Sequence, residues 1–399
     1  MSFNEEYWRV NEMIFDYVIV GAGLAGSVLA ERIANKLDKK VLIIEKRGHI
    51  GGNCYDNYDE NGILVHKYGP HIFNTESKEV WNYLSKFTEW YLYKHEVLGF
   101  IDGKKVPIPF NLNTLKELLP ESKARELEEK LVDKFGYNVK IPILELKEVE
   151  DVNLNVLTDF IYQKIFLNYT VKQWELKPEE LDPSVTGRVP VFISNDNRYF
   201  QNSYQGMPRE GYTKIFEKML NNENIKILLN TDFKEVMDVD FTINKIYLFG
   251  EEFQGKLIFT GKIDEFFNYE FGELPYRSLR FEFENEDLEY FQEVGTVNYP
   301  NDYDFTRITE FKHLTGQKKS DTTIVKEYPQ NYDMKIKGKE IPYYPIPKKE
   351  NHELYGRYKE KTENWDNIIF VGRLAEYRYY SMSDVVESAL NIFRNDINE

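Results

Sequence analysis

Apolar runs and amphipathic stretches alternate in the first fifty residues of the chain. Tyr17–Val20 is a short apolar run rich in β-branched residues, which is typical of a strand buried on both faces. Leu24–Leu37 has a helix-compatible pattern, and Val41–Ile44 repeats the buried-strand pattern. The chain is therefore predicted to begin with a β–α–β unit.

The hydrophobic pattern changes further along the chain. Residues 115–135 and 152–168 carry apolar residues at helical spacing and predict helices. Residues 276–344 read as strand-like runs separated by turn residues, which predicts an antiparallel sheet. A last buried strand at 368–371 precedes a predicted helix at 382–395. The fold class is α/β, with a first domain assembled from separate segments, an inserted helical domain and an antiparallel sheet.

Glycines follow the first strand at the spacing of a dinucleotide-binding turn. Gly21 makes the tight turn, Gly23 lets the backbone approach a pyrophosphate, and Gly26 permits close packing of helix on strand. The helix N-terminus offers N–H groups to the phosphates. Glu45 lies about 20 residues beyond the glycines, where an acid can hold ribose hydroxyls. Strand, glycines, helix, strand and acid in this order predict a dinucleotide site rather than a chance turn.

A second glycine pair continues the pattern beyond Glu45. Gly51, Gly52 and Asn53 resemble the extension found in the FAD-binding oxidoreductase-like superfamily, where the pair lies against the same dinucleotide. The alternative is a surface turn, since Gly-Gly-Asn is common in turns. The position close to the first glycines favours non-covalently bound FAD over NAD.

Composition limits the class of protein. The chain has 399 residues, 30% charged and 15% aromatic residues, and a formal net charge of −16. A chain this acidic is not expected to bind nucleic acid, and an anionic ligand needs a local group of arginines. The only cysteine, Cys54, fits a reducing compartment, and the six histidines have no metal-ligand spacing. No apolar run approaches membrane-spanning length, so we expect a cytoplasmic protein without a metal or membrane partner.

Several longer motifs identify the chain as a member of a known family by resemblance. Residues 66–75 read HKYGPHIFNT, residues 169–174 read YTVKQW, and residues 372–380 read GRLAEYRYY. Asn195–Phe200 and the segments around Arg277, Arg307, Glu327 and Tyr344 also match in order. The pattern from about residue 14 to the end of the chain resembles the bacterial UDP-galactopyranose mutases.

The resemblance implies an isomerase of nucleotide-sugar and polysaccharide (O-antigen) metabolism. Members interconvert a nucleotide-linked hexopyranose and hexofuranose without net redox, and reduced FAD acts as the nucleophile. An external reductant such as NAD(P)H is implied as a partner, and a homo-oligomer is left open. A flavin oxidoreductase and a non-catalytic FAD-binding protein are the alternatives, and the site motifs argue against both.

The resemblance also implies a role for individual residues. Arg188 and Arg307 are expected to hold the diphosphate, because a guanidinium binds two oxygens at once, and His71 is expected beside flavin and sugar. An inert loop arginine is the alternative for Arg188, and core packing for Trp174. The expected substrate-binding residues are Tyr169, Thr170, Trp174, Tyr199, Arg277, Glu327, Tyr344, Tyr379 and Asn74. The expected cofactor-binding residues are Gly21, Gly23, Gly26, Glu45, Gly52, Asn53, Arg373 and Met382.

Two positions depart from the family pattern, and both concern the sugar. The family has histidine where this chain has Asn74 and aspartate where it has Ser381. Both changes remove charge from the expected pocket. UDP-galactose is the first expectation for the substrate, with dTDP-fucopyranose and UDP-N-acetylgalactosamine as alternatives.

The expected domain organisation follows from the same resemblance. FAD-binding segments at 14–92, 204–272 and 346–399 form a Rossmann-like domain. Residues 93–203 form the helical insert, with a mobile loop at about 177–190, and residues 273–345 form the substrate-facing antiparallel sheet. Residues 1–13 are an extension without assigned chemistry.

Overall fold

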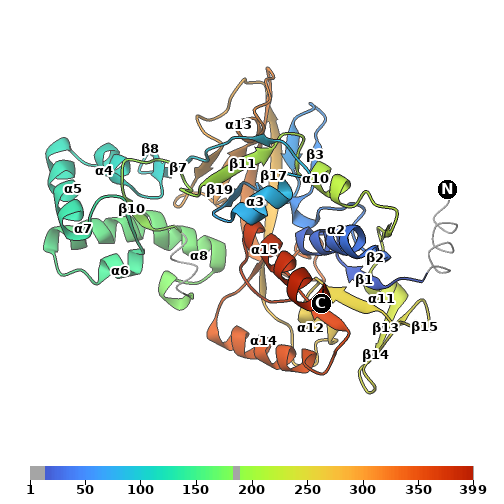
Figure 1. Ribbon diagram of the computed structural model, residues 1–399. Coiled ribbons are helices and arrows are strands. Elements are labelled where there is room, and N and C mark those ends of the chain that lie inside the picture. The colour runs from blue at the N-terminus through green and yellow to red at the C-terminus, as the bar shows by residue number, and fades with distance from the viewer. Residues whose placement is uncertain (1–13, 183–188, 399) are drawn as a thin grey trace.

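The apolar runs near the start of the chain form the centre of a five-stranded parallel sheet (Figure 1). In the computed structural model, which describes residues 14–182 and 189–398, the strand order is β12-β2-β1-β16-β22 and every pair is parallel. The strands are β1 (Tyr17–Val20), β2 (Val41–Ile44), β12 (Ile225–Leu228), β16 (Lys256–Phe259) and β22 (Ile368–Phe370). Three separate stretches of the chain thus build one sheet, as predicted. The expected extension at 1–13 lies outside the described residues.

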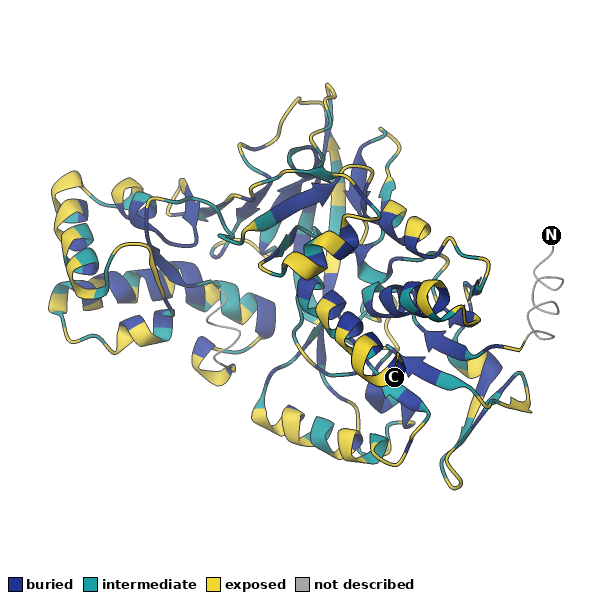
Figure 2. Ribbon diagram, in the orientation of Figure 1, coloured by how far each residue is buried: buried dark blue, intermediate teal, exposed yellow. Residues whose placement is uncertain are grey.

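Helices cover both faces of this sheet, which explains why β1 and β2 are apolar at every position. α2 (Leu24–Leu37) and α15 (Met382–Ile392) share one buried cluster with one face. α12 (Ile263–Phe266) and α14 (Lys349–Thr362) share a second cluster with the other face. Figure 2 shows that the strands between these helices are buried. The predicted bounds of β1, α2 and β2 are confirmed.

A seven-stranded sheet stands beside the parallel one, in the order β21-β17-β20-β19-β18-β7-β8. Its pairs are antiparallel except β18 with β7, so the predicted antiparallel sheet is in fact slightly mixed. β7 (Val97–Ile101) and β8 (Lys104–Ile108) lie in the stretch predicted as the helical insert. They belong to this sheet instead, because β8 pairs with β7 and β7 pairs with β18. The other strands are β17 (Tyr276–Glu286), β18 (Thr296–Asn298), β19 (Arg307–Glu310), β20 (Thr322–Asn331) and β21 (Tyr344–Pro345).

The helical region extends to one side of the sheets, at the left of Figure 1, and has its own apolar core. The stretch predicted as one helix over 115–135 forms two helices, because Pro120 stands between them. The helix predicted over 152–168 continues through the π-helical turn Tyr162–Leu167 to Trp174. The helices are α4 (Leu112–Leu118), α5 (Glu121–Phe135), α6 (Ile143–Lys147), α7 (Val152–Ile161) and α8 (Asn168–Trp174).

Shorter elements complete the described chain. One three-stranded sheet consists of β5 (Phe73–Thr75), β11 (Tyr204–Pro208) and β6 (Trp90–Tyr91). The remaining strands are β3 (Asp56–Tyr58), β4 (Leu64–His66), β9 (Val139–Ile141), β10 (Val191–Ile193), β13 (Met237–Asp240), β14 (Lys245–Leu248) and β15 (Glu251–Glu252). The remaining helical segments are α3 (Lys78–Leu84), α10 (Tyr212–Met219), α11 (Phe233–Val236), α13 (Phe311–Thr315), Gly52–Cys54, Pro178–Glu180 and Phe393–Ile397.

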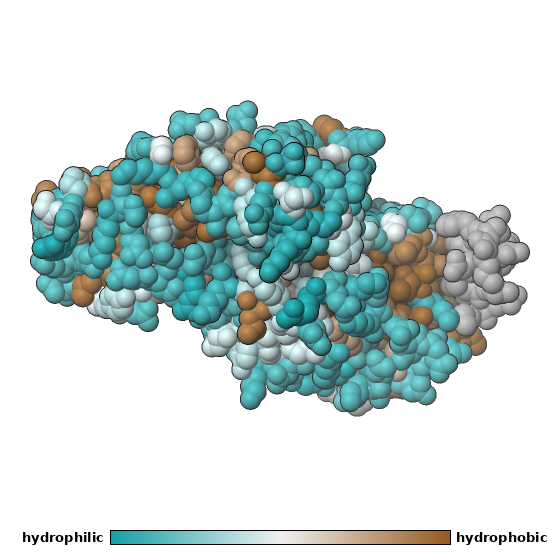
Figure 3. All heavy atoms as spheres, turned by 90° about the horizontal axis from the view of Figure 1, so that it is seen from above, coloured by the Kyte–Doolittle hydropathy of each residue, from teal (hydrophilic) through white to brown (hydrophobic). Residues whose placement is uncertain are grey.

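The surface agrees with an acidic, polar chain. Figure 3 shows one face on which hydrophilic residues predominate and apolar residues form separate small groups. Within residues 14–182 and 189–398, no helix is both long enough and apolar enough to cross a membrane.

Candidate functional site

A first cavity opens at the carboxyl ends of β1 and β2, where the glycine turn leads into α2. Its lining includes the predicted residues Gly21, Gly23, Glu45, Gly52, Asn53, Arg373 and Met382. Gly21 has φ +103°, and a Cβ added to it would lie 2.2 Å from Thr260 Oγ1. A Cβ on Gly23 would meet only Gly52 Cα, at 3.9 Å, so the protein itself has room for a side chain there. The packing of the protein itself therefore does not require a glycine at position 23.

Gly26 has a different task. It does not line the first cavity, and a Cβ on it would lie 2.1 Å from the carbonyl oxygen of Gly21. α2 could not pack on β1 with a side chain at this position. Gly26 therefore sets the contact between helix and strand, which brings the free N–H groups of α2 to the cavity.

Two charged side chains, Glu45 and Arg47, line the first cavity close to the glycine turn. Glu45 is buried, and its carboxylate accepts the backbone N–H groups of Ala22 (2.8 Å) and Arg47 (2.9 Å). Arg47 lines the same cavity; its Nη2 donates to Asn53, while its buried Nη1 has no partner among the described residues. A buried N–H donor in a cavity suits a ligand rich in acceptors, such as a dinucleotide. Sequence reasoning missed Arg47, although it lies two residues after the predicted acid.

A second cavity of about 480 Å³ lies between the helical region and the seven-stranded sheet. Most of the predicted substrate-binding residues line it: Asn74, Tyr169, Thr170, Trp174, Tyr199, Arg307, Glu327, Tyr344 and Tyr379. The two cavities share five lining residues: Asn53, His71, Arg373, Ser381 and Met382. They are therefore adjoining spaces that meet at the N-terminus of α15.

An ion pair on neighbouring strands supplies the charge of the second cavity. Arg307 and Glu327 stand opposite each other on β19 and β20, and Nη2 and Nε of Arg307 donate to the two carboxylate oxygens at 2.8 and 3.0 Å. Burial disfavours the guanidinium charge, but the attraction of Glu327 outweighs it and raises the pKa of Arg307. Glu327 thus holds Arg307 charged and fixed, and the hydrogen bonds to Glu327 use Nε and Nη2 of the guanidinium.

Aromatic rings form another wall. Trp174, Tyr344 and Tyr379 meet at centroid distances of 5.2 to 6.0 Å, and Tyr379 lies edge-on to both partners. Burial raises the pKa of Tyr169 and of Tyr344, so both hydroxyls remain protonated donors. This arrangement offers flat faces for a base and hydroxyl groups for a sugar or phosphate.

Three histidines lie in or near this region: His71 lines both cavities, His95 lines the second, and His66 is buried behind His71. Each is neutral because burial lowers its pKa to about 3. His66 Nδ1 accepts the backbone N–H of His71 at 3.0 Å, so the buried His66 side chain is hydrogen-bonded. His71 Nδ1 lies 2.8 Å from the carbonyl oxygen of Gly69. A carbonyl can only accept, so this nitrogen carries the proton, and Nε2 of His71 is an acceptor at the junction.

Both departures from the family pattern lie in the second cavity. Asn74 is on β5, and its Nδ2 is 3.3 Å from the carbonyl oxygen of Ile72. Ser381 is the N-cap of α15, where its hydroxyl accepts the N–H of Asp384 and the Asp384 carboxylate accepts the N–H of Ser381. Ser381 thus has a structural task that an aspartate could also perform.

Two predicted arginines require separate comment. Arg188 lies outside the described residues. Arg277 is 1% exposed and does not line the second cavity: its guanidinium donates to the carbonyl oxygens of Gln173 and Lys172, to the Asn331 side chain, and pairs with Glu175. These partners are at the C-terminal end of α8, so Arg277 holds the helix that carries Tyr169 and Trp174.

Three polar residues of the second cavity escaped sequence reasoning. His95 precedes a strand without any recognisable motif. Gln173 Oε1 and Asn298 Oδ1 are buried without a hydrogen-bond partner in the described part of the chain. Cys54, by contrast, is a buried residue of the core, and burial raises the pKa of its thiol to about 12. The unpartnered acceptors indicate a ligand with N–H or O–H donors.

The parallel sheet with a glycine turn after β1 defines a dinucleotide-binding protein of the Rossmann type. A family model for an NAD(P)-binding Rossmann-like domain matches residues 19–87. The fold also resembles the crystal structure of a putative protoporphyrinogen oxidase from Exiguobacterium, with a TM-score of 0.60, 14% identity and coverage of 95% of this chain and 97% of that one.

The particular family follows from the rest of the chain. A family model for UDP-galactopyranose mutase matches residues 164–379. The dTDP-fucopyranose mutase of Escherichia coli is 35% identical over 94% of this chain and 96% of its own length. The UDP-galactopyranose mutase of Mycoplasma genitalium is 35% identical over 94% and 93%. The crystal structure of a reduced UDP-galactopyranose mutase superposes with a TM-score of 0.71 at 15% identity, covering 96% of this chain and 94% of that one. The chain belongs to the UDP-galactopyranose mutase family, and as a mutase it is an isomerase.

Proposed function

We propose that the protein interconverts a nucleotide-linked hexopyranose and hexofuranose, with UDP-galactopyranose as the first substrate, and that it uses reduced FAD. One observation supports this most directly: a dinucleotide cavity and a cavity with a fixed arginine meet at five shared residues. A reaction between a cofactor and a sugar diphosphate needs such a junction.

The first cavity fits FAD by the character of its walls. Gly23 leaves open space, the N-terminus of α2 faces phosphate groups, and Arg47 presents an unpartnered N–H. Arg373 donates to the carbonyl oxygens of Tyr343 and Tyr380, which places its charge between the two cavities. When bound and reduced, FAD supplies the nucleophile for the anomeric carbon and is regenerated, so no net redox occurs. A reductant such as NAD(P)H would prepare it.

The chain's own residues hold the leaving group and the sugar. Arg307, oriented by Glu327, binds the diphosphate so that it departs and returns without diffusing away. Arg188 is proposed as its second cation. Tyr169 and Trp174 provide surfaces for the base, since every base has a π-face. The Nε2 atom of His71 accepts a hydrogen bond from a ligand at the junction, and the imidazole ring remains neutral.

A second substrate, dTDP-fucopyranose, is favoured by two observations. Asn74 and Ser381 make the cavity less charged than the family pattern does, and a 6-deoxy sugar needs fewer polar partners. The Escherichia coli relative named as a dTDP-fucopyranose mutase is also among the similar proteins. UDP-N-acetylgalactosamine remains a third substrate to test.

The test is direct incubation with each nucleotide sugar. The yellow purified protein is reduced with dithionite, mixed with each of the three sugars, and analysed by chromatography for the furanose product. We expect product with reduced protein and none with oxidised protein. A protein without bound FAD that also ignores added FAD would overturn the proposal. Net oxidation of substrate, without ring contraction, would instead identify an oxidoreductase.

The role of Arg188 has its own test. Arg188→Ala should lose most turnover while FAD content stays normal, and Arg188→Lys should recover little because bidentate binding is lost. Near-normal turnover of Arg188→Ala would show an inert loop arginine.

A further inference from the structure

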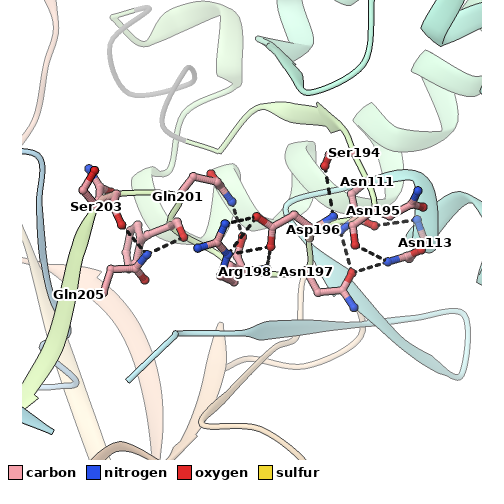
Figure 4. Close-up of polar contacts among 12 residues, drawn as sticks. Asn111, Asn113, Ser194, Asn195, Asp196, Asn197, Arg198, Gln201, Ser203 and Gln205 are labelled. Atoms are coloured by element: carbon pink, nitrogen blue, oxygen red, sulfur yellow. Dashed lines mark hydrogen bonds and ion pairs between the residues drawn. The ribbon is translucent and has the colours of Figure 1, made fainter. Parts of the chain in front are cut away.

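The segment between β10 and β11 carries two aromatic residues into the second cavity. Among residues 194–205, Tyr199 and Phe200 are the two that line it. Both rings contact the imidazole of His95, at centroid distances of 5.7 and 6.0 Å. The other side chains of this segment can therefore influence a ligand only through these two rings. Figure 4 shows the polar contacts that hold the segment.

Three asparagines, Asn111, Asn113 and Asn197, form a cluster at the start of α4 (Figure 4). Oδ1 of Asn197 accepts the side-chain N–H groups of Asn111 at 3.1 Å and Asn113 at 2.8 Å. Asn111 is buried, and its own Oδ1 accepts the backbone N–H groups of Asn113 and Thr114 as the N-cap of α4. This asparagine cluster ties the first turn of α4 to the residue two positions before Tyr199.

Further hydrogen bonds hold the part of the segment that lies next to the second cavity. The N–H of Tyr199 donates to the carbonyl oxygen of His95 at 2.7 Å. The side-chain N–H groups of Gln201 and Gln205 donate to the carbonyl oxygens of Arg198 and Phe200 at 2.6 and 3.1 Å. The segment between Ile193 and Tyr204 has little regular secondary structure, so side-chain hydrogen bonds carry much of its positioning.

We propose that Asn197 is a positioning residue for the mutase reaction. Its amide oxygen holds the segment against α4 so that Tyr199 and Phe200 keep their places beside the nucleotide sugar. Asn197 does not line the cavity and acts through these rings. This inference rests on the proposed function, because the substrate is the ligand that the rings contact.

Substitutions at 197 separate this role from general stability. Asn197→Ala loses both accepted hydrogen bonds and should lower kcat/KM about tenfold, mainly through KM. Asn197→Asp keeps an oxygen in the same place and should restore most of the loss. Asn113→Ala removes an amide that donates to Asn197 Oδ1 and to the carbonyl oxygen of Asn195, and it should cost about twofold. Asn195→Ala is the matched control, because the Asn195 side chain contacts Lys116 and Tyr137 and takes no part in the asparagine cluster; its kcat/KM should equal that of the wild type.

A double-mutant cycle tests whether Asn197 acts through Tyr199. The effect of Asn197→Ala on kcat/KM and on the dissociation constant of UDP should largely disappear in a Tyr199→Ala background. Melting temperatures identify variants that fail to fold, and Asn113→Ala then carries the test. The inference would be overturned if the effects of Asn197→Ala and Tyr199→Ala were fully additive. Equal losses in Asn197→Ala and Asn197→Asp, or unchanged kinetics in Asn197→Ala, would also overturn it. If the wild type shows no mutase turnover, the proposed function fails, and UDP binding still tests Asn197.

Discussion

The two cavities that meet at α15 are built in different ways. The first depends largely on backbone: glycines, a helix N-terminus and one acid come from a continuous stretch between β1 and Cys54. The second depends on side chains from segments far apart in the sequence, such as Asn74, Tyr169, Arg307 and Tyr379. Such a backbone site is sensitive to added atoms, which either meet neighbouring backbone, as at Gly26, or enter the cavity, as at Gly23. A side-chain site fails when atoms are removed, because its partners are left unpaired.

Two arginines on strands of the seven-stranded sheet differ in whether their side chains line the second cavity. Arg307 and Arg277 both come from its strands, yet only Arg307 lines the second cavity. The guanidinium of Arg277 is occupied by carbonyl oxygens at the end of α8. A sequence motif therefore identifies an arginine with a role near the site, but it does not distinguish a ligand-binding arginine from one that supports a helix.

The largest effect is expected where the backbone site leaves no room. Gly26→Ala places a Cβ within 2.1 Å of the Gly21 carbonyl oxygen, so α2 must move off β1. We expect a loss of about 3 kcal/mol in the free energy of unfolding, measured by urea denaturation. Gly23→Ala is the matched control: it should fold normally, since its nearest neighbour is 3.9 Å away, but bind less FAD. Equal stability of all three proteins would show that the glycines are interchangeable.

Removing the fixed cation should have the next largest effect. Arg307→Ala leaves Glu327 buried without its partner and the diphosphate without its donor. We expect kcat/KM to fall on the order of 100-fold with FAD content unchanged. Arg307→Lys keeps the charge but cannot bridge Glu327 and the diphosphate, so it should recover only a small part. If Arg307→Ala retains most of its kcat/KM, the arginine has only a structural role.

Acid should weaken the region around the second cavity. His66, His71 and His95 have folded-state pKa values lowered by burial to about 3, so the unfolded chain binds their protons first as pH falls. Their stabilising contribution is complete above about pH 6.5 and is lost between 6.5 and 3, on the order of 2 kcal/mol for each at pH 5.

Thermal unfolding at pH 7.5 and 5.0 measures this loss. His66→Asn keeps an acceptor for the His71 N–H and should lose less stability on acidification than the wild type. His352→Gln removes an exposed imidazole and should behave as the wild type does. A pH dependence that His66→Asn leaves unchanged would contradict a buried neutral His66.

The smallest effect is expected for the choice of sugar. Asn74→His with Ser381→Asp restores the family pattern, and aspartate can still cap α15. We expect the ratio of kcat/KM for UDP-galactose over dTDP-fucopyranose to rise several-fold, about 1 kcal/mol for a matched polar contact. Ser381→Thr, which keeps the cap and adds no charge, is the control. A wild type that already prefers UDP-galactose, with a ratio unmoved by both changes, would mean that these departures do not set specificity.

The sequence by itself determined the glycine turn of the first cavity and the strands and helix beside it, whereas much of the remaining lining comes from residues 231–265 and 342–385. The bounds of β1, α2 and β2 match the structure, because local patterns set buried strands and an amphipathic helix and the glycine spacing sets the turn between them. The family motifs also indicated most residues of the second cavity, although motifs do not describe contacts.

Only the tertiary structure decided which of those residues face a ligand. It placed Arg277 under α8 and Ser381 at the cap of α15. It also placed in the cavity Gln173, whose motif gave it no role, and His95 and Asn298, which belong to no motif. It also moved β7 and β8 from the expected helical insert into the seven-stranded sheet. Apart from the local cap formed by Ser381 and Asp384, these results depend on pairing between residues distant in sequence, and the free energy of such pairing is set by burial and hydrogen-bond partners that no local pattern contains.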